Sequence, residues 1–419
     1  MAYRHGAFVQ EQATAFVAVQ EVDSALPVVV GTAPVHNLAE GSHVPVNEPL
    51  LCYKMEEVVA QFGAPAEGEN AHDYTLYEFA DVYFNKYKVA PVVLINVFDP
   101  ARHTGNAEGS ESPRPDVGKV TSKDIIGNID PDTLRRGGLQ LVTKIFPLFR
   151  MVPALILAPG FSADPEVALA IESSCTSISG FFTAEGVIDM PESIGNYTKA
   201  AAWLNDNNLT SEKLIAVFGS PTNGGSVQYG SSHLAGIMAA RDAENDGIPY
   251  WSPSNYRMQA EGASFAGEDL NLTPEEAALL NGNGMVTWLN FIGGWVAWGN
   301  MTACYPGVTD VKDCSIPIRR MFNWVGNTLI TNSWQKIDNP LNHRMIETVQ
   351  ETFNIWLNGL VGKGILLAGR VTFETTDNPT SDLMGGKVIW HVYLTPPNAA
   401  QELVFTLEYD PSALETLFG

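Results

Sequence analysis

Three serines are the first residues to consider as catalytic nucleophiles. Ser162 lies in PGFSAD, Ser254 in SPSN and Ser264 in GASFAG. None of them completes G-x-S-x-G, the strained turn that presents a serine hydroxyl at the top of a sheet. Because the members of a catalytic triad meet in space and not along the chain, the sequence leaves a triad open. It offers no positive sign of one.

The turn that follows VVVG at residues 28–31 begins as a nucleotide-binding loop would, and then departs from the pattern. Neither G-x-G-x-x-G nor G-x-x-x-x-G-K-[ST] is completed, and Pro34 stands where a phosphate-binding helix should open. We therefore expect a strand end packed in a sheet, and no bound cofactor.

Histidines and cysteines give no metal-binding pattern. The eight histidines are scattered singly, without H-x-x-x-H or a Cys–His pair at ligand spacing, and His36 and His43 share a polar loop. The four cysteines are too far apart for a disulfide framework in a large chain without a secretory signal. We expect buried free thiols at Cys52, Cys175, Cys304 and Cys314.

Arg319 and Arg320, in IPIRRMFNW, form a basic spot on an acidic chain. They could be the solvated edge of a helix that makes ion pairs. Alternatively they could contact an acidic partner, because arginine is enriched at interfaces.

Composition favours a protein that assembles with other subunits. Charged residues make up 17% of the 419 residues, below the roughly 25% typical of soluble proteins, so much of the surface could be covered by other copies. The net charge of −23 argues against binding nucleic acid. The N-terminus lacks a secretory signal pattern, and the longest apolar run, 152–158, has the length of a strand. We expect a soluble protein made in the cytoplasm, without direct membrane insertion.

From residue 21 to 246 the pattern predicts an α/β domain with a mostly parallel sheet flanked by helices. Helices are expected from Asp164-Pro165, over 192–204 and over 231–242. A polar peripheral loop and insertion are expected near 103–145. The apolar runs that should form buried strands are 27–34, 91–98, 153–160, 181–189 and 214–220.

Residues 247–419 predict a distinct α+β domain. Thr273-Pro274-Glu275-Glu276 is a capping box with proline at the first helical position. A longer helix should open at Asn339-Pro340, because apolar residues then recur at spacings of three and four. That stripe consists of Leu341, Met345, Val349, Phe353, Trp356 and Leu360.

Two runs rich in β-branched and aromatic residues, 388–394 and 403–409, close the chain on either side of a Pro-Pro-Asn loop. The first run carries apolar side chains on both faces. Two isolated strands at a chain end are marginal in water, so something else must cover them.

The order of short motifs along the whole chain resembles the tail sheath proteins of contractile-tailed phages and related contractile injection particles or tailocins. Each motif is weak alone, and the shared order carries the resemblance. The motifs are YRHG at 3–6, TAF at 14–16, PVVVGTAP at 27–34, NEP at 47–49, FG at 62–63, NVFDP at 96–100, IIGNIDPDTLRRGGLQ at 125–140, ALILAPGFS at 154–162, SPSN at 252–255, LNG at 280–282, WGN at 298–300, RR at 319–320 and the two closing strands.

The resemblance implies a structural, non-enzymatic subunit of a helical polymer of stacked six-membered rings around a tail tube. The polymer would contract on a signal from the baseplate and drive the tube through a target cell envelope. Its partners would be other copies of itself, the tail tube protein, and baseplate and tail terminator proteins. It would assemble in the host cytoplasm and then belong to a virion tail or a released particle.

The resemblance also implies that an N-terminal arm, residues 1–20, and a C-terminal strand leave their own subunit and add to the sheets of neighbours. Arg319, Arg320 and Arg344 are candidates for contact with the tube or another partner. The arm residues expected at these joints are Phe8, Val9, Phe16, Val388, Trp390, Val392, Leu394, Leu403, Phe405 and Leu407.

The sequence leaves two other hypotheses about function open. One is an α/β hydrolase whose serine lies in the loop 252–254. The other is a shell or surface-layer protein that assembles in two dimensions.

Overall fold

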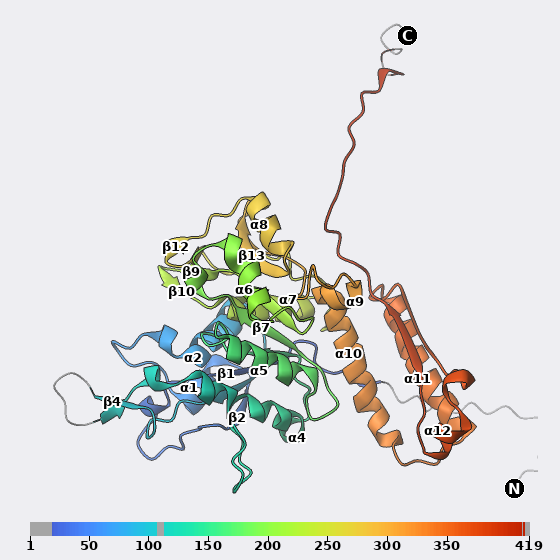
Figure 1. Ribbon diagram of the computed structural model, residues 1–419, viewed down its shortest axis with the longest axis horizontal. Coiled ribbons are helices and arrows are strands. Elements are labelled where there is room, and N and C mark those ends of the chain that lie inside the picture. Colours follow the sequence, from blue (N-terminus) through green and yellow to red (C-terminus); the bar gives the residue numbers. More distant parts are fainter. Residues whose placement is uncertain (1–18, 107–112, 413, 415–419) are drawn as a thin grey trace, which may run out of the picture.

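The computed structural model describes residues 19–106, 113–412 and 414. Its largest element is an eight-stranded sheet (Figure 1). Five neighbouring pairs are parallel, and the two antiparallel pairs lie at the two edges. From edge to edge the strands are β14 (Trp295–Trp298), β13 (Met285–Asn290), β8 (Leu214–Val217), β7 (Glu185–Asp189), β6 (Leu155–Leu157), β1 (Pro27–Gly31), β3 (Val92–Asn96) and β2 (Pro49–Cys52).

The predicted mostly parallel sheet flanked by helices is confirmed. Each of the five apolar runs contains one of the strands β1, β3, β6, β7 and β8. Helix α2 (Thr75–Ala80) packs on β1 and β3, α5 (Pro165–Thr176) on β6 and β7, and α7 (Gly230–Ala243) on β7 and β8. The central strand β1 is buried along its whole length, which explains why it reads as an uninterrupted apolar run.

Local signals place several helix ends correctly. The Asp164 side chain accepts from the Glu166 N–H at 2.9 Å, with proline following at the first helical position. Thr273 and Glu276 form the expected capping box. The helix predicted over 192–204 is broken instead: Gly195, at φ 76°, ends one short turn, and α6 (Ala200–Asp206) begins only later.

The sheet continues past residue 246, the predicted domain boundary. Strand β13 is buried at five successive positions and pairs in parallel with β8. A second, four-stranded sheet also joins segments from both sides of that boundary. It contains β10 (Ser226–Val227), β9 (Ser220–Asn223), β11 (Gly262–Phe265) and β12 (Glu268–Asp269).

The last part of the described chain forms a second hydrophobic core. Helix α11 (His343–Gly362) packs on β15 (Ala368–Thr372), which pairs with β16 (His391–Thr395) in a two-stranded antiparallel sheet. Helix α10 (Ile316–Ser333) connects the two cores. It gives Ile316 to the core of the large sheet, and Met321, Trp324 and Val325 to the second core.

The predicted apolar stripe of α11 is confirmed at Val349, Phe353, Trp356 and Leu360, which are buried in the second core. The helix begins three residues after Pro340, because the Asn342 side chain accepts from the Met345 N–H and caps it.

In the predicted peripheral region, β4 (Thr104–Asn106) and β5 (Pro113–Pro115) form an antiparallel pair.

The four cysteines are buried free thiols, as expected. The remaining helices are α1 (Met55–Phe62), α3 (Ser122–Ile126), α4 (Ile145–Phe149), α8 (Pro274–Asn281), α9 (Val311–Cys314) and α12 (Thr380–Met384).

Candidate assembly surface

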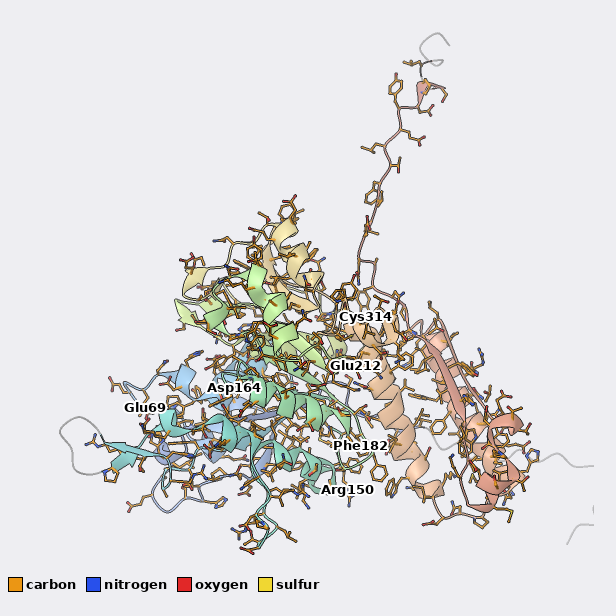
Figure 2. The ribbon with its side chains drawn as sticks, viewed as in Figure 1. Glu69, Arg150, Asp164, Phe182, Glu212 and Cys314 are labelled. Carbon is orange, nitrogen blue, oxygen red and sulfur yellow. The ribbon has the colours of Figure 1, made fainter. Side chains whose placement is uncertain are left out.

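The C-terminal strap, residues 396–412, is an extended segment that leaves the body of the protein after β16 (Figure 1). Figure 2 shows its side chains projecting along its length away from the rest of the protein. The exposed fractions are 74% for Leu403, 82% for Phe405 and 95% for Leu407. A strand-forming sequence with apolar side chains in solvent needs a surface to cover them.

The two-stranded sheet from which the strap leaves has unequal edges. At Val371 of β15, the Asn354 side chain donates to the backbone carbonyl at 2.9 Å and accepts from the backbone N–H at 2.7 Å. Asn378 makes the same pair of bonds to Ile389, just before β16. These amides satisfy backbone groups that have no neighbouring strand.

The outer edge of β16 has no such cover. Within residues 19–106 and 113–412, β16 pairs with β15 alone. Thr372, the last residue of β15, and Trp390, just before β16, each have a buried side-chain polar atom without a partner. The free strand edge of β16 is a template for another strand.

The predicted arm residues fall into three groups. Phe8, Val9 and Phe16 lie outside the described residues. Leu403, Phe405 and Leu407 are exposed on the strap. The first closing run behaves differently, because β16 pairs within its own chain and its apolar side chains pack on the second core: Val388 is half-buried, and Trp390, Val392 and Leu394 contact that core.

Arg320 is buried in its own chain, which gives no support to its expected role as a partner contact. Its side chain is 4% exposed, and its guanidinium donates to Asp242 on α7 at 2.5 Å and to the Ser24 carbonyl at 3.1 Å. Arg319 is largely buried and pairs with Asp313 at 3.0 Å. Arg344 is exposed on α11, where its role as a partner contact stays a prediction. The sequence carries no sign that Arg320 would be buried with Asp242, because the two residues lie 78 positions apart.

The N-terminal segment, residues 19–24, is held between α10 and α11 by side chains that the sequence analysis missed. Asn332 on α10 accepts from the Gln20 N–H and donates to the Gln20 carbonyl, both at 2.8 Å. Trp324 Nε1 donates to the Val22 carbonyl, and Trp356 Nε1 donates to a Glu21 carboxylate oxygen. Asn332 carries no distinguishing signal in the sequence, because α10 also holds Asn323 and Asn327.

The three candidate serines lie in structural contacts. Ser162 is fully buried and donates to Asp189 at 3.3 Å. Burial raises the pKa of Asp189 to about 6. Ser254 accepts from the Gly299 N–H at 3.0 Å, and Ser264 is buried in β11. Among the described contacts, no histidine pairs with any of these hydroxyls, so no serine–histidine pair forms here.

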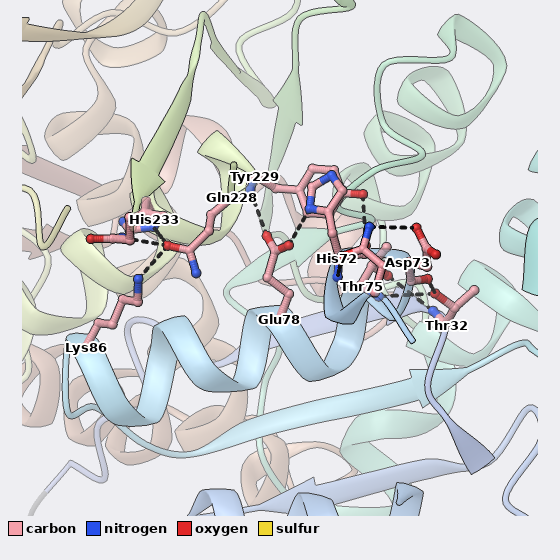
Figure 3. A network of polar contacts seen from close by, with 11 residues as sticks. Thr32, His72, Asp73, Thr75, Glu78, Lys86, Gln228, Tyr229 and His233 are labelled. Carbon is pink, nitrogen blue, oxygen red and sulfur yellow. Dashed lines mark hydrogen bonds and ion pairs between the residues drawn. The ribbon is translucent and has the colours of Figure 1, made fainter. Parts of the chain in front are cut away.

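The network in Figure 3 shows how buried polar groups join α2 to the start of α7. Glu78 accepts from the Tyr229 N–H at 2.8 Å and pairs with His72 at 2.5 Å. Burial raises the pKa of Glu78, and the bond to Glu78 raises that of His72. Burial lowers the pKa of His233 to about 3, so this histidine is neutral where it hydrogen-bonds to Tyr87 and Gln228. The network joins α2 to the start of α7 through buried hydrogen bonds.

The described residues hold neither a metal-binding cluster nor a membrane-spanning helix. No cluster of three or more histidine, cysteine or acidic side chains could hold a metal ion there. None of the described helices combines the length and the apolar character needed to cross a membrane.

Known proteins with similar sequences are tail sheath proteins. The tail sheath protein of Burkholderia phage BcepMu is 23% identical, in an alignment that covers 100% of this chain and 99% of the phage protein. A putative prophage major tail sheath protein of Pseudomonas aeruginosa strain UCBPP-PA14 is 24% identical over 91% of this chain and 90% of that protein. No family model matches the chain.

A solved sheath structure shares the fold of this chain. The sheath of the extracellular contractile injection system PVC, solved in its contracted state, superposes with a TM-score of 0.68 at 15% identity, covering 99% of both chains. Sequence similarity and fold thus both run almost from end to end. They confirm the resemblance that the motifs predicted: over nearly its whole length the chain is similar in sequence to tail sheath proteins, and it shares the fold of a contractile injection system sheath.

Proposed function

We propose that this chain is a sheath subunit that polymerises by inter-subunit strand addition around a tail tube and contracts to drive the tube through a target cell envelope. The observation that carries the proposal is the strap: an apolar, strand-forming segment that contacts little of its own chain. The contracted sheath that shares this fold supports the mechanical part of the proposal.

The strap of one subunit would add to the outer edge of β16 in a neighbour. Backbone hydrogen bonds make such a joint without requiring one shape of side-chain surface. Asn354 blocks the edge of β15 at Val371, whereas β16 has a free edge in the described chain. Strand addition would also stabilise the β15–β16 sheet, because a two-stranded sheet is only marginally stable by itself.

The N-terminal arm would make a second joint. Its last residues are anchored between α10 and α11, in the same part of the protein from which the strap leaves. Each subunit would then be tied to neighbours at both chain ends, in stacked six-membered rings. Polymer connectivity would survive while the rigid bodies rotate.

Contraction requires that the extended polymer be a trapped state of higher free energy than the contracted one. The large sheet and its helices would move as a rigid body and form new contacts, while the arms stay paired. The partners would be other copies of the chain, a tube protein, and baseplate and terminator proteins. Assembly would take place in the host cytoplasm, before the sheath becomes part of a virion tail or a released particle.

The test is electron microscopy of purified protein and of two truncations. The full chain should form long, hollow, striated tubes. Deletion of residues 1–18, or of residues 397–419, should leave a folded monomer that forms no tubes. Normal tubes from both truncated proteins would refute strand addition. Flat arrays from the full chain would instead favour a shell protein, and dispersed particles an enzyme.

A further inference from the structure

A groove of about 720 Å³ lies where the strap leaves the body. Its walls come from segments far apart in the sequence. Three of the short motifs, at 252–255, 280–282 and 298–300, contribute to it, and strap residues 397–401 pass along it. Hydrogen bonds hold these loops against the edge of the large sheet: Asn281 donates to the Met285 and Trp298 carbonyls, and Ser254 accepts from the Gly299 N–H.

Asn300 places an unpaired donor in this groove. The residue is 7% exposed, and its Nδ2 is buried without a hydrogen-bond partner. Ser252 Oγ accepts from the Ser254 N–H at 3.1 Å and donates to Asn300 Oδ1 at 2.5 Å. With the amide in this orientation, its NH₂ group is the unsatisfied end. A buried amide donor without a partner costs free energy until an acceptor arrives.

Arg241 supplies a second donor and a positive charge. Its guanidinium carbon lies 4.6 Å from the centre of the Trp251 ring and 5.2 Å from that of Tyr256, so two aromatic rings hold it in place. Its Nε is buried without a partner, and no carboxylate within residues 19–106 and 113–412 pairs with it. Glu244, one helical turn away, accepts from the Tyr256 hydroxyl instead.

Arg241 is half-buried, and the described contacts give it no ion pair in a chain with 47 acidic and 24 basic residues. Together, a fixed guanidinium and an amide N–H match the acceptors of a carboxylate or a backbone carbonyl. The strap is not that acceptor, because none of the described hydrogen bonds joins residues 397–401 to the groove.

We propose that this groove binds a carboxylate-bearing segment of a second copy of this chain, with Arg241 and Asn300 as its donors. The inference rests on the proposed function in one respect: the strap that passes along the groove brings the second copy to it. It adds a polar contact beside strand addition. An acidic copy provides many carboxylates, and an arginine in a preformed aromatic holder loses little side-chain freedom on binding one.

The contact can be mapped with Arg241→Lys, which keeps the positive charge and provides an amine. Equal amounts of ¹⁴N- and ¹⁵N-labelled variant are assembled and treated with a carbodiimide, which joins an amine directly to a carboxylate. Mass spectrometry should then show the introduced lysine joined to an Asp or Glu of the other isotope. A crosslink confined to single chains, for example to Glu244, or no crosslink at all, would overturn the proposal.

Two charge variants give an independent measurement. Arg241→Glu and Asn300→Asp should each raise the critical concentration for assembly about tenfold or more. Asn300→Asp keeps the acceptor for Ser252 and replaces the unpaired donor. Matched controls are Arg135→Glu and Asn205→Asp, both at exposed positions, and these should assemble like the wild type.

The outcomes separate the two proposals. Tubes that form equally well from the wild type and both groove variants would refute the groove contact and leave the proposed function standing. A wild-type chain that does not self-associate at all would refute both. Circular dichroism of each monomer verifies the fold, and the crosslink of the Arg241→Lys protein decides the matter if Arg241→Glu does not fold.

Discussion

The strap offers a direct test of strand addition, through replacement of Leu403, Phe405 and Leu407 by serine. These side chains are at least 74% exposed, so the monomer should lose no stability. In a joint they would be buried. Burial of a leucine or phenylalanine contributes about 1.5–3 kcal/mol, so the triple variant should weaken each joint by about 5 kcal/mol. Since 1.4 kcal/mol corresponds to a factor of ten, this is about three and a half orders of magnitude in affinity.

The assay is the critical concentration for tube formation, measured by sedimentation and checked by microscopy, together with thermal unfolding of the monomer. A matched control is Leu134→Ser, which removes an equally exposed leucine from the peripheral insertion and should change neither quantity. The reasoning would be refuted by a triple variant that polymerises at the wild-type concentration. It would also be refuted by a large drop in the melting temperature of the monomer, because the strap would then pack on its own chain.

Three further predictions concern the parts that hold the two cores and the N-terminal segment together. Arg320→Met should lower the free energy of unfolding by about 3–5 kcal/mol in urea titrations, because it leaves the Asp242 carboxylate buried without its cation; replacing both residues by apolar ones should cost less. Burial raises the pKa of Glu185 to about 7, so the folded state binds the proton more tightly and stability should fall as pH rises from about 4.5 to 7. Glu185→Gln should remove that fall and be the more stable protein at pH 7.5, and an unchanged pH profile would contradict this. Asn332→Ala removes two bonds to Gln20 and should speed hydrogen exchange at residues 20–22, with a loss of about 1–2 kcal/mol of local stability.

Buried strands and capped helices could be predicted from the sequence because their signals are local. Strand β1 reads as an apolar run since both of its faces are covered, and the bonds at Asp164 and Thr273 involve residues two or three positions away. The same reasoning missed the place of β13, because pairing with β8 is decided by packing across some 70 residues and not by the turn-rich sequence before it.

The candidate surface was predicted in part. The exposed apolar face of the strap follows from alternation along 403–409, but the pairing of β16 with β15 does not. Strand β15 reads AGRVT, without the aromatic or alternating pattern that marks a strand. Arg320 was misplaced for a related reason: a charged pair in sequence signals a wet surface, whereas its partner Asp242 and the Ser24 carbonyl meet it only in the folded chain.

Both ends of the described chain leave from the same small core, and this bears on how a sheath could transmit force. Val19 and Val22 pack against the core that also holds β16, so a pull on either arm reaches α10 and α11 first. From there, two routes lead to the large sheet: the backbone of residues 23–26 runs directly into β1, and α10 reaches the sheet through Ile316 and the buried Arg320–Asp242 pair. A strand-addition joint between two subunits can carry load only if the second core, to which the arms are attached, does not unfold before the joint breaks. Weakening the Arg320–Asp242 pair should therefore damage contraction at a load that leaves tube assembly intact, a separation that no variant of the strap can produce.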